Sequence, residues 1–389
     1  MTRILFIIPA FKHGGTNKSL FNILSFIGHE FDISIMALSH LGPYKDLFNR
    51  EAKIIERDSR LGLLFDNFGN IDLKKDSKKQ IITKLSNKLY RKLYEILIGE
   101  KGREKILNQS VKKIESMNFD TIIAMQEGDV TSFTARIKGK KIAWVRSDYN
   151  EYFKIVMKDE SAVYEKFKSI ICVSEYTRKT FLTKYPQLEE RCYGIHNMID
   201  YNKIIRMSSE KIKYNKLFDN TNFNMVSVGR LSKVKQFDLI PNIASKLKKN
   251  GLMFNWYIIG DGEEKARINM LIEKYNVEDE VVLLGEINNP YPYIKQSDLV
   301  VVTSLSEACP NVINEGKILH VPVITTNFGS AKEFIENGGN GIITNEENII
   351  NDITNLIRNN SYYSEIKSNL SDFLYSNDAI IAKIINILN

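Results

Sequence analysis

The residues best suited to chemistry in this 389-residue sequence are two cations and two carboxylates of its second half. Arg230 and Lys235 lie in the loop Gly229-Arg-Leu-Ser-Lys-Val-Lys235, which follows an apolar run and precedes an apolar pattern of helical period. The first turn of a helix offers free backbone N–H groups and the positive end of its dipole, and fixed cations add full charges. The loop therefore predicts a phosphate or diphosphate site, with a solvated basic turn as the alternative.

Glu307 and Glu315 frame a second candidate site. Pro310 suits the first position of a helix, which we expect to continue to about Leu319. Glu307 then lies in the loop before the helix and Glu315 lies more than one turn inside it. Carboxylates accept hydrogen bonds from vicinal hydroxyls, one set on a sugar ring and the other on a ribose, while the helix start faces the phosphates between them. The pattern fits a sugar nucleotide; a capping acid and an exposed helical glutamate are the alternative.

A third loop, Gly260-Asp261-Gly262, follows the apolar run 254–259. Its glycines permit positive φ angles and a close approach of backbone to ligand. A plain turn from strand to helix is the alternative.

The elements that must position these loops are short β-branched or aliphatic runs that alternate with helical patterns. That alternation is typical of parallel βαβ units and predicts an α/β protein with two Rossmann-like lobes. We place the lobes at residues 1–200 and 201–389, joined near 193–201, with the last helix as a candidate to pack back on the first lobe. Ligands bind at the carboxyl ends of such strands. The predicted strands are 4–8, 33–37, 121–124, 141–145 and 169–173 in the first lobe, and 224–228, 254–259, 281–284, 299–303 and 322–325 in the second.

The order and spacing of these loops resemble the donor-binding half of retaining glycosyltransferase family four, the "group 1" enzymes of GT-B fold. The residues that carry the resemblance are Gly229-Arg230-Leu231, Lys235, Gly260-Asp261-Gly262 and the pair Glu307 and Glu315. The likeness is strongest over residues 224–345. In the first lobe, Gly14-Gly15, Val173-Ser174-Glu175 and Asn197-Met-Ile-Asp200 match the family's usual landmarks. The resemblance implies two parallel-sheet lobes facing a central cleft and the retaining transfer of a hexosyl group from a nucleotide diphosphate sugar, UDP-linked, to a glycan.

The resemblance also implies roles for individual residues. Arg230 and Lys235 would bind the diphosphate, Glu315 the ribose hydroxyls and Glu307 the transferred sugar, so that Glu307, Arg230 and Lys235 form the catalytic set. The family's loop commonly reads Gly-Phe-Pro where this chain has Ala308-Cys309-Pro310, a departure that bears on the donor sugar. The expected donor-binding residues are Gly229, Arg230, Lys235, Gly260, Asp261, Gly262, Glu307, Ala308, Cys309, Pro310, Asn311, Val312 and Glu315.

The acceptor is expected to enter across the first lobe, past Gly14, Gly15, Glu127 and Asp148. Many family members carry a histidine after the strand that ends here at Val145, but this chain has Arg146 on the acceptor side, so no catalytic histidine is assigned. The leaving phosphate would take the acceptor's proton in a front-face substitution, which requires no strong protein base.

Neither a metal nor another cofactor is expected. No two aspartates are separated by one residue, and the five histidines form no H-x-x-x-H pair. We expect the charges of Arg230 and Lys235 to replace a metal at the leaving group.

Residues 74–113 carry thirteen cations and four carboxylates, whereas the whole chain has a net charge of +7. Within this basic segment, apolar residues step by three and four, which predicts a helix with one apolar face bordered by Tyr90 and Tyr94. Such a helix can dock on anionic lipid headgroups, and packing of its stripe on the protein core is the alternative. It lacks the aromatic-lined motifs of RNA or single-strand binders, so no nucleic-acid partner is expected. The stripe consists of Ile82, Leu85, Leu89, Leu93 and Ile96.

The composition, 43% hydrophobic and 26% charged, is that of a soluble globular protein. Three cysteines without C-x-x-C spacing fit a reducing cytoplasm. No apolar run reaches the ~18 residues that span a membrane, and the first run, 1–11, predicts a strand rather than a signal peptide.

These observations predict a cytoplasmic enzyme, peripheral at the inner face of the cell membrane, that adds a sugar to a lipid-linked oligosaccharide of a capsule or another surface polysaccharide. A sugar-nucleotide epimerase of the same fold is one alternative, and it would isomerise or hydrolyse donor without acceptor. A non-catalytic basic module that binds lipid or nucleic acid is another; nucleic-acid binding would show a steep salt dependence.

Overall fold

The computed structural model describes the chain except for residues 13, 40–41, 43, 67–77, 213–217 and 219–220. Contacts divide the chain into two compact units. The first unit comprises residues 1–173, 177–198 and 378–389, and the second comprises 174–176 and 199–377. The chain thus passes from the first unit to the second at residues 198 and 199 and returns before its last helix.

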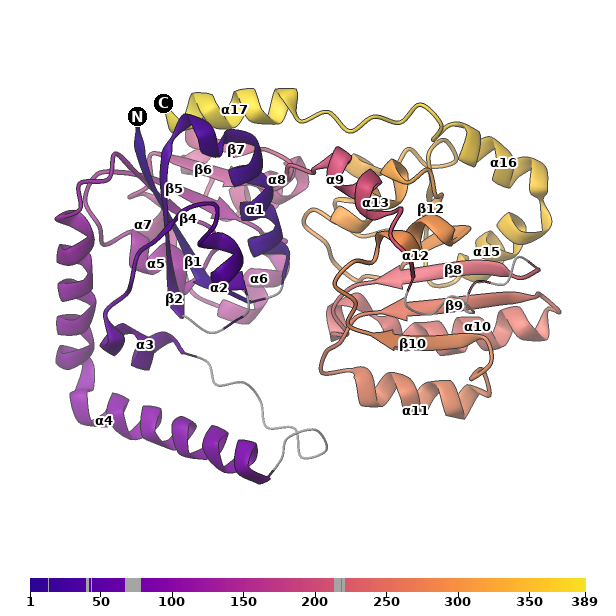
Figure 1. The fold of residues 1–389 in the computed structure, drawn as a ribbon, viewed down its shortest axis with the longest axis horizontal. Helices are drawn as coiled ribbons and strands as arrows, with labels where there is room; N and C mark the ends of the chain where they lie inside the picture. The colour runs from indigo at the N-terminus through magenta and orange to yellow at the C-terminus, as the bar shows by residue number, and fades with distance from the viewer. Residues whose placement is uncertain (13, 40–41, 43, 67–77, 213–217, 219–220) are drawn as a thin grey trace. The chain divides into compact units, whose positions relative to one another are not determined.

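The first unit is built on a parallel sheet that has seven strands within the described residues, in the order β3-β2-β1-β4-β5-β6-β7 (Figure 1). The inner strand β1, between β2 and β4, contributes the side chains of residues 4–8, all fully buried. Strands buried on both faces are expected to be continuous apolar runs, as residues 4–8 are. The strands are β1 (Arg3–Ala10), β2 (Asp32–Ser39), β3 (Lys53–Ile54), β4 (Thr121–Ala124), β5 (Lys140–Val145), β6 (Ser169–Cys172) and β7 (Cys192–Gly194).

Helices pack around this sheet (Figure 1). An aromatic cluster joins some of them, with the ring of Phe181 4.9 Å from that of Tyr149 and 4.8 Å from that of Tyr164. The last helix, α17, belongs to this unit, where Lys140 Nζ donates to the carbonyl of Leu388 at 2.7 Å. The helices are α1 (Gly15–Ile27), α2 (Tyr44–Phe48), α3 (Ser59–Phe65), α4 (Lys78–Glu115), α5 (Asp129–Thr134), α6 (Tyr149–Val156), α7 (Ser161–Tyr164), α8 (Glu175–Leu182) and α17 (Asp378–Leu388).

Helix α4 contains the described part of the basic segment and is broken in the middle. Gly99 has φ 57° and ψ −173°, which no α-helix contains, and the ribbon turns sharply there (Figure 1). After this break, Ile106, Leu107, Val111 and Ile114 are buried in the core of the first unit. The expected helix is present, and residues 74–77 of the segment lie outside the described residues.

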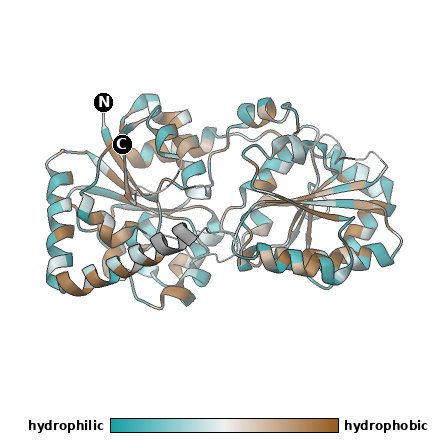
Figure 2. Cartoon of the chain, turned by 60° about the horizontal axis from the view of Figure 1, so that its bottom comes forward, coloured by the Kyte–Doolittle hydropathy of each residue, from teal (hydrophilic) through white to brown (hydrophobic). Residues whose placement is uncertain are grey.

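The second unit has a parallel sheet with six strands among the described residues, in the order β10-β9-β8-β11-β12-β13. Its strands are coloured predominantly hydrophobic in Figure 2. They are β8 (Phe223–Val228), β9 (Phe254–Ile259), β10 (Val281–Gly285), β11 (Leu299–Val302), β12 (Val323–Thr326) and β13 (Ile342–Thr344). The helices are α9 (Tyr201–Met207), α10 (Ile240–Lys249), α11 (Lys265–Tyr275), α12 (Tyr291–Gln296), α13 (Asn311–Ile318), α14 (Ala331–Phe334), α15 (Ile349–Arg358) and α16 (Asn360–Ser368).

Every strand predicted from the sequence is present, within a few residues at each end. The prediction missed β3, β7 and β13, which all lie at an edge of their sheet. Each has only two or three residues and is partly exposed, so it leaves no aliphatic run in the sequence.

Candidate functional site

The side chains of Lys235 and Glu307 form an ion pair in the second unit, with the Lys235 ammonium donating to Oε1 of Glu307. Lys235 follows β8 and Glu307 follows β11, its neighbour in the sheet, so both loops emerge at the same carboxyl edge. Ser304 Oγ donates to the same Glu307 oxygen at 2.7 Å. The Lys235 and Glu307 side chains are 24% and 13% exposed. A cation and a carboxylate are therefore held together, within reach of solvent, where α/β sheets bind ligands.

Buried hydroxyls fix the two loops that carry this pair. Thr303 Oγ1 donates to the carbonyl of Lys235 at 2.8 Å, and Ser330 Oγ donates to the carbonyl of Glu307 at 2.7 Å. Both hydroxyl residues are fully buried. These contacts hold the backbone of each charged residue in place before any ligand binds.

The cationic loop does not lead directly into an α-helix, contrary to the sequence prediction. Lys235 ends a 3-10 turn, and the next residue, Gln236, has a positive φ of 48°. A left-handed residue interrupts a right-handed helical path. A second short turn follows, and α10 begins at Ile240. An anion would therefore meet Lys235 through its ammonium group rather than through the dipole of α10.

Arg230 lies apart from this pair in its side-chain contacts. Its Nη2 is 3.1 Å from Oε2 of Glu263, and the two side chains are 73% and 49% exposed. Glu263 was not among the predicted site residues, although it directly follows Gly262 in the sequence. The guanidinium can thus move toward a ligand at little cost in free energy, because an exposed ion pair contributes little to stability.

The glycines of Gly260-Asp261-Gly262 are required by the packing of two loops. A Cβ on Gly260, whose φ is 151°, would lie 1.8 Å from the carbonyl oxygen of Gly229. A Cβ on Gly262 would lie 2.2 Å from the carbonyl oxygen of Leu231. The backbone of Leu231 also donates to the carbonyl of Asp261 at 3.0 Å. The glycine-rich loop therefore supports the loop that carries Arg230 and Lys235.

Helix α13 begins at Asn311 after Pro310, and Glu315 lies inside it. Glu315 is 4% exposed, which contradicts the alternative of an exposed helical glutamate. A Cβ on the next residue, Gly316, would lie 2.9 Å from Val323 and 3.1 Å from Val300, so α13 packs tightly on β11 and β12. The predicted residues Ala308 and Cys309 precede this helix, and Asn311 and Val312 form its first turn.

In the first unit, a buried network joins three carboxyl-edge loops. Glu127 Oε2 accepts the backbone N–H of Arg146 at 2.9 Å. Arg146 Nη2 donates to Asn197 Oδ1 at 2.9 Å, and Ser19 Oγ donates to the same oxygen at 3.1 Å. Glu127 and Arg146 were predicted as acceptor-side residues. Ser19 and Asn197 were assigned no role, although Asn197 follows β7 and belongs to the segment 197–200 that matches a family landmark.

The remaining acceptor-side predictions lie at helix starts. Gly14 and Gly15 begin α1, and a Cβ on either would meet nothing within 4 Å. Asp148 is buried and caps α6, with Oδ1 accepting the backbone N–H of Asn150 at 3.0 Å. Asp148 thus has a structural role in addition to any contact with an acceptor.

A buried carboxyl that the sequence did not indicate lies in the first unit near Glu127. Glu160 accepts hydrogen bonds from the hydroxyls of Tyr149 at 3.1 Å and Tyr152 at 3.4 Å. Burial raises the pKa of Glu160, the two hydroxyls lower it, and the charge of Glu127 raises it further. Two buried carboxyls therefore share this side of the first unit, and proximity of like charges favours protonation of Glu160.

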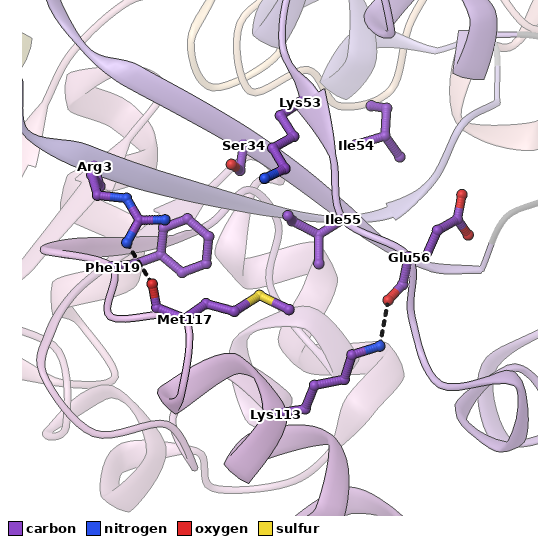
Figure 3. Close-up of a pocket in the computed structure, with 9 residues that line it drawn as sticks. All are labelled: Arg3, Ser34, Lys53, Ile54, Ile55, Glu56, Lys113, Met117 and Phe119. Carbon is purple, nitrogen blue, oxygen red and sulfur yellow. Dashed lines mark hydrogen bonds between the residues drawn. The ribbon is translucent and has the colours of Figure 1, made fainter.

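A pocket of about 330 Å³ opens at the other edge of the first sheet, where β1 and β3 begin (Figure 3). Arg3 Nη1 donates to the carbonyl of Met117 at 2.5 Å, and Lys113 Nζ donates to that of Glu56 at 3.1 Å. None of the predicted site residues lines it. Because α/β sheets bind ligands at the carboxyl ends of their strands, this pocket is not the candidate site.

Among the described residues, no group of three or more His, Cys, Asp or Glu side chains is arranged to hold a metal ion. Over the same part of the chain, no helix combines the length and apolar character needed to cross a membrane.

Residues 208–371 match the family model described as "Glycosyl transferases group 1". An uncharacterized glycosyltransferase of Methanocaldococcus jannaschii is 31% identical over 198 residues, which cover 48% of each chain. The chain thus spans about half the length of this curated relative. The Campylobacter jejuni N-acetylgalactosamine-N,N'-diacetylbacillosaminyl-diphospho-undecaprenol 4-alpha-N-acetylgalactosaminyltransferase is 24% identical over 273 residues, covering 67% of this chain and 70% of the relative.

Solved structures match over the full chain. Anabaena HepE, in complex with UDP and glucose, has a TM-score of 0.76 at 18% identity and covers 100% of this chain and 99% of its own. WaaG, a glycosyltransferase involved in lipopolysaccharide biosynthesis, has a TM-score of 0.69 at 14% identity, with 99% of both chains covered. The predicted GT-B fold is confirmed.

Proposed function

We propose that this chain, whose residues 208–371 belong to the glycosyl transferases group 1 family, is a retaining glycosyltransferase of hexosyl type. Its donor is a nucleotide diphosphate sugar, UDP-linked, and its acceptor is a glycan of a capsule or another surface polysaccharide. The observation that carries the proposal is the ion pair between Lys235 and Glu307, held at the carboxyl edge of the second sheet inside the matched region. HepE, which has the same fold, was solved with UDP and glucose.

The donor's parts are assigned to separate side chains of the second unit. Glu315 accepts hydrogen bonds from the ribose hydroxyls, and Arg230 and Lys235 interact with the diphosphate. Glu307 accepts a hydroxyl of the transferred sugar. Lys235 links the diphosphate contact to the sugar contact. Its ammonium contacts the Glu307 carboxylate and has further N–H groups for a phosphate oxygen.

The proposed reaction replaces one bond at the anomeric carbon by another on the same face. The bond from the anomeric carbon to the diphosphate oxygen breaks as the acceptor oxygen bonds to that carbon. The acceptor's proton passes to the leaving phosphate oxygen. The cations of Lys235 and Arg230 stabilise the charge that develops on that phosphate, so the reaction proceeds without a metal.

The acceptor is assigned to the first unit, past Gly14, Gly15, Glu127, Arg146 and Asp148. We place the enzyme in the cytoplasm, peripheral at the inner face of the cell membrane, with a lipid-linked acceptor. The Campylobacter jejuni relative, whose name specifies a diphospho-undecaprenol-linked acceptor, supports this choice.

A two-stage assay tests the proposal. Nucleotide diphosphate sugars are first screened for their effect on the unfolding temperature, and those that raise it are incubated with lipid-linked glycans. The expected products are an extended glycan with a retained anomeric configuration and free nucleotide diphosphate. A donor that is isomerised without acceptor would support an epimerase instead, and binding of nucleic acid with no nucleotide product would support the non-catalytic alternative.

A further inference from the structure

The first half of α4 exposes a row of large apolar side chains. Leu85, Leu89, Leu93 and Ile96 are 50%, 59%, 49% and 68% exposed. Their spacing of four, four and three residues places them on one face of the helix. A helix in water normally turns such a face toward a core, but among the described residues no core covers this face.

The opposite side of the same half-helix holds it on the first unit. Tyr94 and Ile98, one turn apart, pack against the unit's core. Arg91 donates to the carbonyls of Asp66 and Leu64, both at 2.9 Å. The helix is therefore already anchored through its other side, and the leucine row points away from the first unit. The row does not pack on the core of that unit.

The sequence left two alternatives open for the basic segment, docking on lipid and packing on the protein core. The break at Gly99 separates a part of the helix that fits each. Beyond Gly99 the apolar residues of α4 are buried in the core, as the packing alternative requires. Before Gly99 the row remains exposed, as a surface-docking helix requires. The basic segment thus consists of a packed half and an unpartnered half.

The charge of the unpartnered half identifies the kind of surface that it fits. Residues 78–98 contain six cations and one carboxylate in the sequence; Arg91 anchors the helix on the first unit, so five lysines remain for an external surface. A cationic helix with an exposed leucine face matches an anionic lipid surface, where the leucines enter the acyl boundary and the cations meet the headgroups. Nucleic acid would satisfy the cations but leave the leucines exposed.

We infer that residues 85–97 of α4 form a docking surface for an anionic lipid bilayer, with Leu85, Leu89, Leu93 and Ile96 inserted at the boundary between headgroups and acyl chains. Exposed Leu97 and Tyr90 border this surface. The inference rests on the proposed function only for the purpose of this surface, which is to bring the enzyme to a lipid-linked acceptor. Lipid binding itself requires neither donor nor acceptor.

The full chain is tested by sedimentation with vesicles of phosphatidylcholine alone and of an equimolar mixture of phosphatidylcholine and phosphatidylglycerol. Wild type should bind the anionic vesicles and release as salt screens the headgroups. The triple variant Leu89→Ser/Leu93→Ser/Ile96→Ser should bind them about tenfold more weakly or worse, because it loses the apolar insertion. The matched control is Met253→Ser/Met270→Ser/Leu374→Ser, which alters exposed apolar residues of the second unit and should bind like wild type.

A charge variant separates the two contributions. Each Lys or Arg near an anionic bilayer strengthens attachment roughly fivefold, so Lys84→Glu/Lys88→Glu/Lys92→Glu should release the chain from anionic vesicles. Circular dichroism and the unfolding temperature verify that each variant folds.

Three results would overturn the inference. The first is equal vesicle binding by wild type and the leucine variant, and the second is no vesicle binding by wild type. The third is a wild-type dimer in sedimentation velocity that the leucine variant converts to monomer, which would assign the surface to a second copy of the chain. Transfer of sugar to a short water-soluble acceptor, measured in parallel, should survive in every variant. If wild type itself shows no such transfer, that result would count against the proposed function and not against the lipid surface.

Discussion

Lys235 and Glu307, 72 residues apart in sequence, meet through a single carboxylate oxygen, Oε1, which also accepts the hydroxyl of Ser304. Among the described residues, none donates to the other oxygen, Oε2. The two donors orient the carboxylate, and Oε2 remains available for a sugar hydroxyl. The ion pair therefore joins the proposed phosphate contact to the proposed sugar contact before the donor arrives.

The substitution Lys235→Ala should nearly abolish transfer while the fold survives. The ammonium is proposed to offset charge on the leaving diphosphate, and loss of one preorganised donor costs about 3 kcal/mol, roughly a hundredfold in kcat/KM. Lys233→Ala, on the same turn but exposed, is the matched control and should behave like wild type. Initial rates at varied donor concentration measure both. Equal rates for Lys235→Ala and wild type would remove Lys235 from the site.

The variants Glu315→Gln and Glu307→Gln should separate nucleotide binding from sugar transfer. Glu315, buried in α13, is assigned to the ribose, and a hydrogen bond to a charged group contributes about 1.5–3 kcal/mol. Titration calorimetry with free nucleotide diphosphate should show weaker binding for Glu315→Gln and near wild-type binding for Glu307→Gln. Glu307→Gln should instead lower kcat. If both variants bind the nucleotide like wild type, the ribose assignment is wrong.

Ser304→Ala should lower kcat about tenfold and leave the affinity for free nucleotide diphosphate unchanged. Ser304 is buried, and its hydroxyl acts only through Glu307, which then loses a hydrogen bond of about 1–2 kcal/mol. The control Ser245→Ala removes a hydroxyl from another buried position of the second unit, on α10. A parallel loss of nucleotide affinity in Ser304→Ala would indicate a general disruption of the loop instead of a positioning role.

The sheets were predictable because their inner strands are buried on both faces. The run at residues 4–8 is apolar throughout and is typical of a buried element. The edge strands β3 and β13 are held by one neighbour each and carry mixed side chains, so pairing rather than composition defines them. The delayed start of α10 was equally invisible, since a positive φ at Gln236 is a property of the folded loop.

The charged residues of the site were predictable by type, and their supports were not. Glu307 and Lys235 stand out because their order and spacing, together with the glycine-containing loops, resemble a family motif. Ser304 and Asn197 are common residue types whose value lies in their hydrogen bonds. Ser304 donates to Glu307, three residues on, and Asn197 accepts from Arg146, 51 residues before it. Only the folded structure joins Ser19 to Asn197, 178 residues away.

Transfer should survive removal of divalent metal. The proposed mechanism assigns the neutralisation of the diphosphate to Lys235 and Arg230, so EDTA should leave the rate largely unchanged. The measurement is the initial rate with and without EDTA, after dialysis against chelator. Complete inhibition that Mn²⁺ or Mg²⁺ reverses would show that the cations do not suffice.

The buried Lys317 of α13 should make the second unit more stable as pH rises above 8. Its ammonium donates to the carbonyl of Phe334 at 2.9 Å and lies 4.4 Å from the ring centre of Phe373. Burial lowers the pKa of Lys317 from 10.5 to about 8. Between these values the unfolded chain binds a proton that the folded protein releases, so the free energy of unfolding should increase with pH across this window.

Below pH 8 both states are protonated, and the folded protein bears the full cost of burying the charge, on the order of 3 kcal/mol. Lys317→Met removes the titrating group and should remove this rise, whereas Lys295→Met, at an exposed lysine of α12, should retain it. Urea unfolding at pH values below 8 and above 9 measures the difference between the variants, in which all other titrating groups are shared. An identical rise in Lys317→Met and wild type would assign the pH dependence to another group, because the variant cannot release that proton.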